Sequence, residues 1–543
     1  MSVENRSDCH VLVIGSGGAG IRAAIEASNT GDVIIASKTI TGKGGCTVMA
    51  EGGYNAVIND TDSISSHYDD TLKGGSYLND PELVNILVTE SPNRFKDLLN
   101  WGAVFNLNDN NCIAQRPFGG QKYPRTCYSG DHTGHEIVMT LLEQLRGTNV
   151  EIRDEITVID LIKDGDTVCG AVFCDRNGDL GIIRSDSVIL ATGGAGQIYD
   201  VTTNSSAGTG DGYAIGYRAG ATLIDMEQVQ FHPTGIAYPY TARGRLITEA
   251  VRGEGGVLIN SCGDRFMKRY DPVRMELSTR DIVARSIATE ILDGRGTEHN
   301  GVWLDVTHLS SKQIETRLPV MLNQFLDLGI DIRNQPMEVS PTTHHFMGGL
   351  KIDSNAKTTV PNLFAAGEVT GGVHGANRLG GNALADTQVF GYRAGKNAGS
   401  VPPRTHNKID DKLISSFENR ISNLYNGSSN IHDVKNNLKH IMWNNVGIFR
   451  NELDLKIAER DVNKLKEIPL KINSSNEIPD AIITENMLQV ASLVIEGALL
   501  RRESRGAHTR NDVSTKWSCE LSPFGHTYFS NGKSSINILA ENL

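Results

Sequence analysis

The sequence predicts an α/β protein with a Rossmann-like dinucleotide-binding domain, an inserted α+β capping domain and a C-terminal helical domain. The first indication is a β–α–β pattern in residues 9–38, where an apolar run, a glycine-rich turn, a segment of helical periodicity and a second apolar run follow one another. Strand-like runs also occupy residues 156–162, 167–175 and 186–194, and a buried-strand pattern returns at 361–372. Long helical patterns begin at Asn407.

These changes of pattern set the expected domain boundaries. We expect the dinucleotide-binding domain at residues 1–235 and 345–402, interrupted by the capping domain at 236–344, which mixes helices with polar loops. The helical domain is expected at 407–513, and residues 514–543 carry little signal beyond a polar tail. A chain of 543 residues can form several such domains and can bury a large cofactor.

Charge and hydropathy narrow the classes of partner. The 52 basic and 64 acidic residues give a net charge of −12, which argues against nonspecific binding to nucleic acid or to anionic membranes. No apolar run approaches the roughly 20 residues of a bilayer span, and the first ten residues lack the apolar core of a signal peptide. We therefore expect a cytoplasmic protein with no direct membrane span and no nucleic-acid partner.

The cysteine pattern argues against a bound metal. The eight cysteines are scattered and form no C-x-x-C pair; they stand at positions 9, 46, 112, 127, 169, 174, 262 and 519. Iron–sulfur clusters and structural zinc sites usually need clustered thiolates. We therefore expect no metal site in this chain.

A glycine fingerprint follows the first predicted strand. Residues 15–20 fit the pattern G-x-G-x-x-G between a strand and a helix, where glycines allow backbone N–H groups and the helix dipole to meet a pyrophosphate. The candidate residues are Gly15, Gly17, Gly18, Ala19 and Gly20. The second strand ends in Ser37 and Lys38 instead of an acidic residue, which makes NAD the less favoured ligand.

Further glycine-marked motifs could enclose the rest of an extended dinucleotide, although each alone could be an ordinary loop. A glycine-rich run at 42–53 allows the backbone to approach a flat ligand closely. Short motifs close strands near 191 and 366, and a T-G-D-G string stands at 209–212. The candidate residues in these motifs are Gly45, Thr47, Gly52, Gly53, Ala191, Thr192, Gly193, Asp211 and Glu368.

With these motifs in order, the chain resembles the succinate dehydrogenase/fumarate reductase flavoprotein family. The resemblance runs from the N-terminal fingerprint to the string Ser504-Arg505-Gly506-Ala507-His508, which is nearly the whole chain. It implies that the dinucleotide is FAD, and it adds Arg378, Ala383 and Leu384 to the expected cofactor-binding residues. It also implies a small dicarboxylate of the fumarate/succinate kind as substrate.

The resemblance extends to a set of expected substrate-binding residues: Phe118, His232, Thr248, His344 and Arg378. Phe118 lies in a loop that caps the substrate in the family, and Arg378 offers a bidentate fork to a carboxylate. A single histidine is more often a structural residue, but two histidine motifs and an arginine motif match the same family in order.

Three charged residues resemble the family's proton-delivery system. The resemblance implies that Arg280 protonates one alkene carbon while the flavin gives hydride to the other, and that Glu249 and Arg252 relay protons from solvent. Free guanidinium keeps its proton far above neutral pH, so this role needs a buried relay that returns the proton at once. The alternative is a structural salt-bridge network.

One position departs from many membrane-linked members, which attach FAD covalently through a histidine just before the threonine of the glycine-rich run. That position is Cys46 here, so we expect noncovalent FAD. A covalent flavin generally raises the reduction potential and favours succinate oxidation, so its absence favours fumarate reduction.

The sequence therefore favours the flavoprotein subunit of a fumarate reductase, fed with electrons by a separate iron–sulfur subunit. A soluble branch of the family is thiol-driven and uses coenzyme M and coenzyme B, which is compatible with this chain. Three alternatives stay open: the succinate dehydrogenase direction, an L-aspartate oxidase and a flavin electron-transfer module without catalysis. Phe118 and Gln121 argue against the oxidase.

Overall fold

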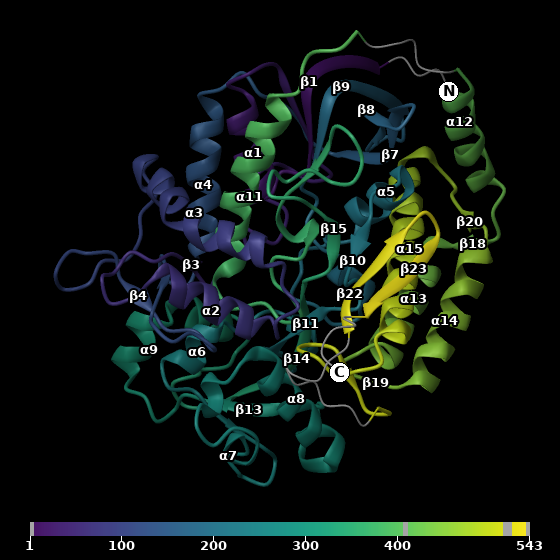
Figure 1. Cartoon of the computed structure of the whole chain (residues 1–543). Coiled ribbons are helices and arrows are strands. Elements are labelled where there is room, and N and C mark those ends of the chain that lie inside the picture. The colour runs from purple at the N-terminus through teal and green to yellow at the C-terminus, as the bar shows by residue number, and fades with distance from the viewer. Residues whose placement is uncertain (1–4, 406–410, 514–523, 539–543) are drawn as a thin grey trace.

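The computed structural model describes residues 5–405, 411–513 and 524–538. Figure 1 shows the N-terminal strands and helices at one end, the capping elements around α6 to α9 at the other, and the C-terminal helices along one side. Cys519 and half of the expected C-terminal tail, residues 514–523 and 539–543, lie outside the described residues.

A seven-stranded sheet forms the dinucleotide-binding region, with strand order β6-β2-β1-β9-β8-β7 and β16 paired to β9. Its strands are β1 (Asn5–Ile14), β2 (Val33–Ala36), β6 (Glu151–Arg153), β7 (Ile156–Asp164), β8 (Thr167–Asp175), β9 (Leu180–Leu190) and β16 (Leu363–Ala365). Strand β1 runs parallel to β2 and β9, and β16 runs parallel to β9. The carboxyl ends of β1, β9 and β16 therefore meet at one edge, although β16 is far away in sequence.

Helices and short strands surround this sheet. They are α1 (Gly18–Ala27), α2 (Ile64–Gly74), α3 (Pro81–Asn100), α4 (Thr133–Arg146), α5 (Asp211–Ala219), α11 (Asn382–Gly399) and a small sheet of β3 (Tyr54–Asn55), β4 (Gln115–Arg116) and β5 (Thr126–Cys127). Helices α1 and α11 lie side by side (Figure 1), because Gly391 and Gly395 leave room for the backbone of Ala19 and Ala23. The residues that precede α11 are thereby fixed beside the fingerprint.

The capping region has its own sheet and its own apolar core. The antiparallel sheet has the order β11-β14-β13-β12, with β11 (Val229–Ile236), β12 (Val257–Ile259), β13 (Val302–Asp305) and β14 (Met337–Phe346). Its helices are α6 (Glu249–Gly253), α7 (Met267–Tyr270), α8 (Arg280–Glu290), α9 (Ser311–Arg317) and α10 (Pro319–Leu326). The sheet extends a few residues beyond 236–344, because β11 and β14 run back toward the dinucleotide-binding region.

The helical patterns expected after Asn407 form α12 (Asp411–Tyr425), α13 (Ile431–Asn445), α14 (Glu452–Glu467) and α15 (Ile478–Leu500). Short parallel pairs join β18 (Ser429–Asn430) to β20 (Leu470–Lys471), and β19 (Phe449–Arg450) to β21 (Thr509–Arg510). Among the described residues, one helical stretch, Ser475–Leu500, is long and apolar enough to cross a membrane. Most of its apolar window is buried inside the protein, as in the core helix of a folded domain.

The C-terminal tail contains structure that the sequence pattern did not indicate. Strands β22 (Phe524–Ser530) and β23 (Lys533–Ile538) form a hairpin, and β22 pairs with β10 (Leu223–Ile224). The five-stranded sheet continues through β15 (Gly349–Lys351) to β17 (Thr370–Gly371). The side chain of Thr527 donates to Glu227 at 2.8 Å, and His526 pairs with Asp225 at 2.6 Å. The hairpin is held by these contacts with residues far away in the sequence, and a local sequence pattern cannot indicate such contacts.

A buried carboxylate joins several loops of the capping region. Glu290, at the end of α8, is fully buried and accepts hydrogen bonds from Arg269, Arg295, Tyr270 and Asn260 at 2.6 to 3.0 Å. Burial alone would raise the pKa of Glu290, but the hydrogen bonds outweigh it and lower the pKa to about 2.

The substitution Glu290→Gln is expected to lower stability at pH 7 by about 2 kcal/mol, because a neutral amide replaces the buried carboxylate that accepts charged hydrogen bonds from Arg269 and Arg295. Since the folded pKa lies below the unfolded value near 4.5, this stabilisation is complete above pH 4.5 and is lost as the pH falls toward 2. Thermal unfolding of both proteins between pH 3 and pH 7 measures the difference, with Glu298→Gln, an 85% exposed glutamate, as the control. A difference that stays constant over this range contradicts the role given to Glu290.

Candidate active site

A cavity of about 610 Å³ opens at the carboxyl ends of the parallel strands and reaches the capping region. Its lining includes every expected cofactor-binding residue except Gly20, and it includes Phe118, His232, Thr248, Glu249, Arg280, His344 and Arg378. Gly20 instead packs against the fingerprint turn, where an added Cβ would lie 1.9 Å from the carbonyl oxygen of Gly15. Arg252 also lies outside the lining, fully buried behind Glu249.

One end of the cavity is bordered by backbone with no side chain in the way. Gly15 follows β1 with a φ of +108°, and Gly17 precedes the first turn of α1. A Cβ added at Gly45 or Gly193 would meet no protein atom within 4 Å, so both glycines border open volume. The buried hydroxyl of Thr192 has no hydrogen-bond partner among the described residues. A cradle of this kind suits an extended, polar ligand such as a dinucleotide.

Lys38 forms an ion pair with Asp211 at this end of the cavity. Its Nζ donates to Asp211 Oδ2 at 2.6 Å and to Thr209 Oγ1 at 2.5 Å, and Asn486 of α15 donates to the other oxygen of Asp211. Burial would raise the pKa of Asp211, but Lys38 and these hydrogen bonds lower it. The C-terminal helical region therefore reaches the edge of the cofactor cradle through Asn486.

Two further residues of the cradle, Cys46 and Glu368, are partly buried and carry perturbed pKa values. Burial, together with the neighbouring Glu368, raises the pKa of Cys46 to about 12, so its sulfur is a protonated thiol at neutral pH. Burial also raises the pKa of Glu368 to about 7, although its Oε1 accepts the N–H of Phe346 at 3.0 Å.

An ion pair lies where the cavity meets the capping region. Arg280, the first residue of α8, donates from Nε to Glu249 Oε2 at 2.9 Å, and the backbone N–H of Gly119 donates to Glu249 Oε1 at 2.8 Å. Arg252 Nη2 lies 3.8 Å from Glu249 Oε2. Burial would raise the pKa of Glu249, but Arg280 and Arg252 outweigh it and lower the pKa. Glu249 is therefore an ionised carboxylate between two guanidinium groups.

Two neutral histidines face each other beside this pair. The rings of His232 and His344 lie 5.0 Å apart, and His344 Nδ1 shares a hydrogen bond of 2.8 Å with Thr203 Oγ1. Burial, reinforced by neighbouring positive groups, holds the pKa of both histidines well below the usual value. Each ring therefore offers a neutral N–H donor.

Arg378 supplies a second cation to the same wall. Burial, followed by the repulsion of Arg280, lowers the pKa of Arg378 to about 9, so it stays protonated at pH 7. Its Nε has no hydrogen-bond partner in the described part of the chain. Phe118, which is 4% exposed, closes this wall beside Gly52 and Gly380. Two guanidinium groups and neutral N–H donors thus converge on one part of the cavity, an arrangement that suits a small dianion.

Gln230 ties these groups together, although it is not among the residues expected from the sequence. Arg280 donates to Gln230 Oε1 at 3.3 Å, and Gln230 Nε2 donates to the carbonyl oxygen of Arg378 at 2.9 Å. Gln230 stands two residues before His232 on β11, so strand alternation places both on the same face. The two-residue spacing from His232 is therefore a sequence signal from which Gln230 could have been predicted as a residue of the site.

The comparisons with known proteins match almost the whole chain. The family model "FAD binding domain" matches residues 10–384, and "Fumarate reductase flavoprotein C-term" matches residues 435–533. The chain therefore belongs to the FAD-dependent flavoprotein family of the succinate dehydrogenases and fumarate reductases, and its cofactor is FAD.

Individual relatives agree with this assignment. One subunit of the fumarate reductase (CoM/CoB) of Methanothermobacter marburgensis is 51% identical over 93% of this chain and 94% of that protein. The fumarate reductase flavoprotein subunit of Mycobacterium tuberculosis is 37% identical over 93% and 92% of the two chains. Among solved structures, a variant of the E. coli quinol fumarate reductase flavoprotein covers 99% of this chain and 98% of that chain, with 32% identity and a TM-score of 0.93.

The fingerprint allows a direct test of FAD binding. Gly17 has a negative φ of −75°, and a Cβ there would lie at an ordinary 3.6 Å from Thr47 Oγ1. The apoprotein should therefore tolerate Gly17→Ala, while the added methyl group blocks the approach of the pyrophosphate to the start of α1.

We expect Gly17→Ala to lower FAD affinity about tenfold or more with an unchanged apoprotein melting temperature. Flavin fluorescence titration of the apoprotein measures the affinity, and circular dichroism checks the fold. Unchanged FAD binding in a folded variant contradicts the placement of the cofactor at this turn.

Proposed function

We propose that the chain is the flavoprotein subunit of a fumarate reductase that converts fumarate to succinate. The observation that carries the proposal is the convergence of Arg280, Arg378, His232 and His344 on one cavity that is continuous with the FAD cradle. Two cations and neutral N–H donors match a ligand with a carboxylate at each end. The names of relatives that share this chain's length and family support the same reading.

The side chains have separate roles in this proposal. Arg378, Thr248 and the histidines hold the carboxylates and draw negative charge onto one of them, while Phe118 excludes water. FAD bound in the cradle would supply a hydride for one alkene carbon. Arg280 gives a proton to the adjacent carbon. Glu249, which is ionised at rest, takes up a proton by way of Arg252 and returns it to Arg280 through the 2.9 Å hydrogen bond. Fumarate, a hydride and a proton together give succinate.

Arg252 lies on the outer side of this relay. Its Nη1 donates to the carbonyl oxygen of Glu276 at 2.6 Å, while its Nε and Nη2 have no hydrogen-bond partner among the residues described. Burial lowers the pKa of Arg252, and Glu249 opposes that change. A purely structural arginine would have hydrogen-bond partners for all its N–H groups. The unpartnered nitrogens of Arg252 therefore favour a role in which it holds Glu249 and passes protons inward.

The electrons reach FAD from a separate iron–sulfur subunit in this proposal. No group of three or more His, Cys, Asp or Glu side chains could hold a metal ion among the described residues. The relative that is 51% identical carries the name fumarate reductase (CoM/CoB). We accordingly propose thiol cofactors of the coenzyme M and coenzyme B kind as the ultimate electron source, and the cytoplasm as the location.

The substitution Arg280→Leu tests the reaction. The variant should keep its FAD, because Arg280 lies at the dicarboxylate end of the cavity, but turnover of fumarate should fall about 10³-fold or more through loss of the proton donor. Oxidation of reduced viologen by fumarate measures turnover, and the exposed Arg274→Leu serves as the control. Turnover within threefold of the original rules out Arg280 as the acid.

The attachment of FAD is a separate prediction. Because Cys46 is a protonated thiol at neutral pH, we expect no covalent bond and complete release of FAD on acid denaturation. Absorbance of supernatant and pellet after precipitation measures the two fractions. Flavin that stays with the pellet, and is released after Cys46→Ser, contradicts the prediction.

A further inference from the structure

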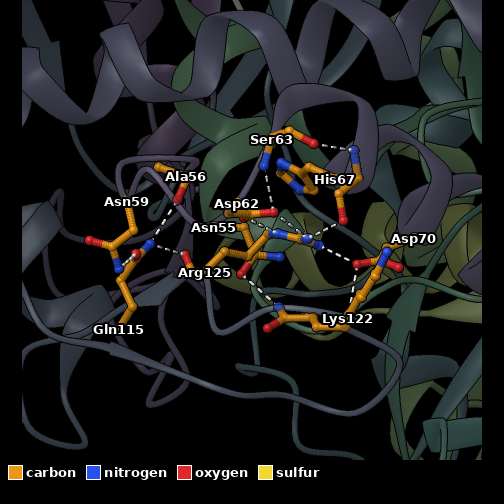
Figure 2. A network of polar contacts seen from close by, with 12 residues as sticks. Asn55, Ala56, Asn59, Asp62, Ser63, His67, Asp70, Gln115, Lys122 and Arg125 are labelled. Carbon is orange, nitrogen blue, oxygen red and sulfur yellow. Dashed lines mark hydrogen bonds and ion pairs between the residues drawn. The ribbon is translucent and has the colours of Figure 1, made fainter.

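The loop that carries Phe118 is the tip of a hairpin anchored on its far side by a buried ionic cluster (Figure 2). Strands β4 and β5 pair antiparallel, with Arg116 opposite Thr126, so residues 117–125 form the tip. Phe118 and Gly119 lie on the side of the cavity, whereas Lys122 and Arg125 face helix α2. The position of the ring therefore depends on what holds the opposite side of the tip.

Arg125 is the centre of this cluster. Its side chain is fully buried and donates to both oxygens of Asp62, at 2.9 and 3.0 Å, and to Asp70 Oδ2 at 2.7 Å. Burial would lower the pKa of Arg125, but the hydrogen bonds to Asp62 and Asp70 outweigh it and raise the pKa. Figure 2 shows the guanidinium between the two carboxylates, one just before α2 and one within it.

Asp70 also holds the backbone of the tip. The N–H of Lys122 donates to the same Oδ2 atom of Asp70 at 2.8 Å, so one carboxylate oxygen fixes the middle of the tip and its end. Within the tip, Gln121 Oε1 accepts the N–H of Phe118 at 3.2 Å, and Gln121 Nε2 donates to the carbonyl oxygen of Gly380 at 3.3 Å. The tip is thus tied to α2 on one side and to the segment after Arg378 on the other.

These anchors act at a distance from the reacting groups. Asp62, Asp70, Gln121 and Arg125 are all outside the cavity lining. Phe118 does line the cavity, and the neighbouring N–H of Gly119 holds Glu249. Any freedom given to the tip changes the closure over the substrate first, because Glu249 keeps its separate bond to Arg280.

We infer that Asp70 is a positioning residue that sets the affinity for the dicarboxylate by fixing the Phe118 tip against helix α2. The inference rests on the proposed role of Phe118 at the substrate. In the described part of the chain, the hydrogen bonds and the ion pair of the Asp70 side chain are made with residues of the tip. Its removal therefore weakens the closed state of the substrate pocket and leaves the groups that transfer hydride and proton in place.

Asp70 is the member of the cluster that can be removed with the least damage to folding. Without Asp70, Arg125 and Asp62 remain a paired, electrically neutral couple with bidentate geometry. Removal of Arg125 would instead leave buried carboxylates facing each other without their cation. Asp69, the exposed neighbour on the same helix, gives a control of equal charge.

We expect Asp70→Ala to raise the KM for fumarate at least about fivefold, with kcat within about twofold of the original enzyme. The Asp70→Asn variant still offers an oxygen to Lys122 and Arg125, so its KM should lie between those of the original enzyme and Asp70→Ala. Reduced-viologen assays on the full-length FAD-loaded chain measure both constants, with Asp69→Ala expected to match the original. A KM equal to that of Asp69→Ala, or a fall in kcat with unchanged KM, overturns the inference.

Hydrogen exchange separates this inference from the proposed function. Amides of residues 117–127 should exchange at least about fivefold faster in Asp70→Ala than in Asp69→Ala, whatever the substrate is. Equal exchange rates overturn the positioning role. If the tip is loosened and the unaltered enzyme has no activity with fumarate, the proposed function fails and so does the affinity claim.

Discussion

The ion pair between Glu249 and Arg280 is the contact on which the candidate site depends. It joins the first turns of two capping helices, and the N–H of Gly119 adds the hairpin tip from the dinucleotide-binding region. A buried carboxylate is costly unless cations and N–H donors surround it, so these segments must come together before Glu249 can be buried in ionised form. The same requirement places Arg280 beside Gln230 and through it beside Arg378.

The local electrostatics of the cavity are opposite to those of the whole chain. The net charge is −12, yet Arg280, Arg378 and Arg252 lie together, and their positive field adds to burial in keeping His232 and His344 neutral. This local charge attracts a dianion that the chain as a whole would repel. Neutral histidines can donate hydrogen bonds to carboxylates without adding further buried positive charge, so the wall stays compatible with folding.

The sequence predicted the parts of this arrangement that have a local signature. The β–α–β unit, the strands near residues 156–190 and the helices after 407 follow from periodicity and turn chemistry, and the family was identified correctly from ordered motifs. Long-range partners could not be read in this way. Asp62, Asp70 and Arg125 meet only because α2 packs on a hairpin, and β22 and β23 find their partner strand far upstream. Gly20 and Arg252 belong to the expected motifs but do not line the cavity, and a sequence motif does not show which of its residues reach the cavity surface.

The most direct test is the oxidation of reduced viologen by fumarate, catalysed by the purified FAD-loaded chain, with oxidation of L-aspartate measured in parallel. We predict dye oxidation that depends on fumarate and saturates with it, and no turnover of aspartate. The reason is that two cations and Phe118 surround a site for a dicarboxylate that carries no amino group. FAD-loaded protein that fails to oxidise the dye with fumarate but does oxidise aspartate would contradict the account and favour the oxidase.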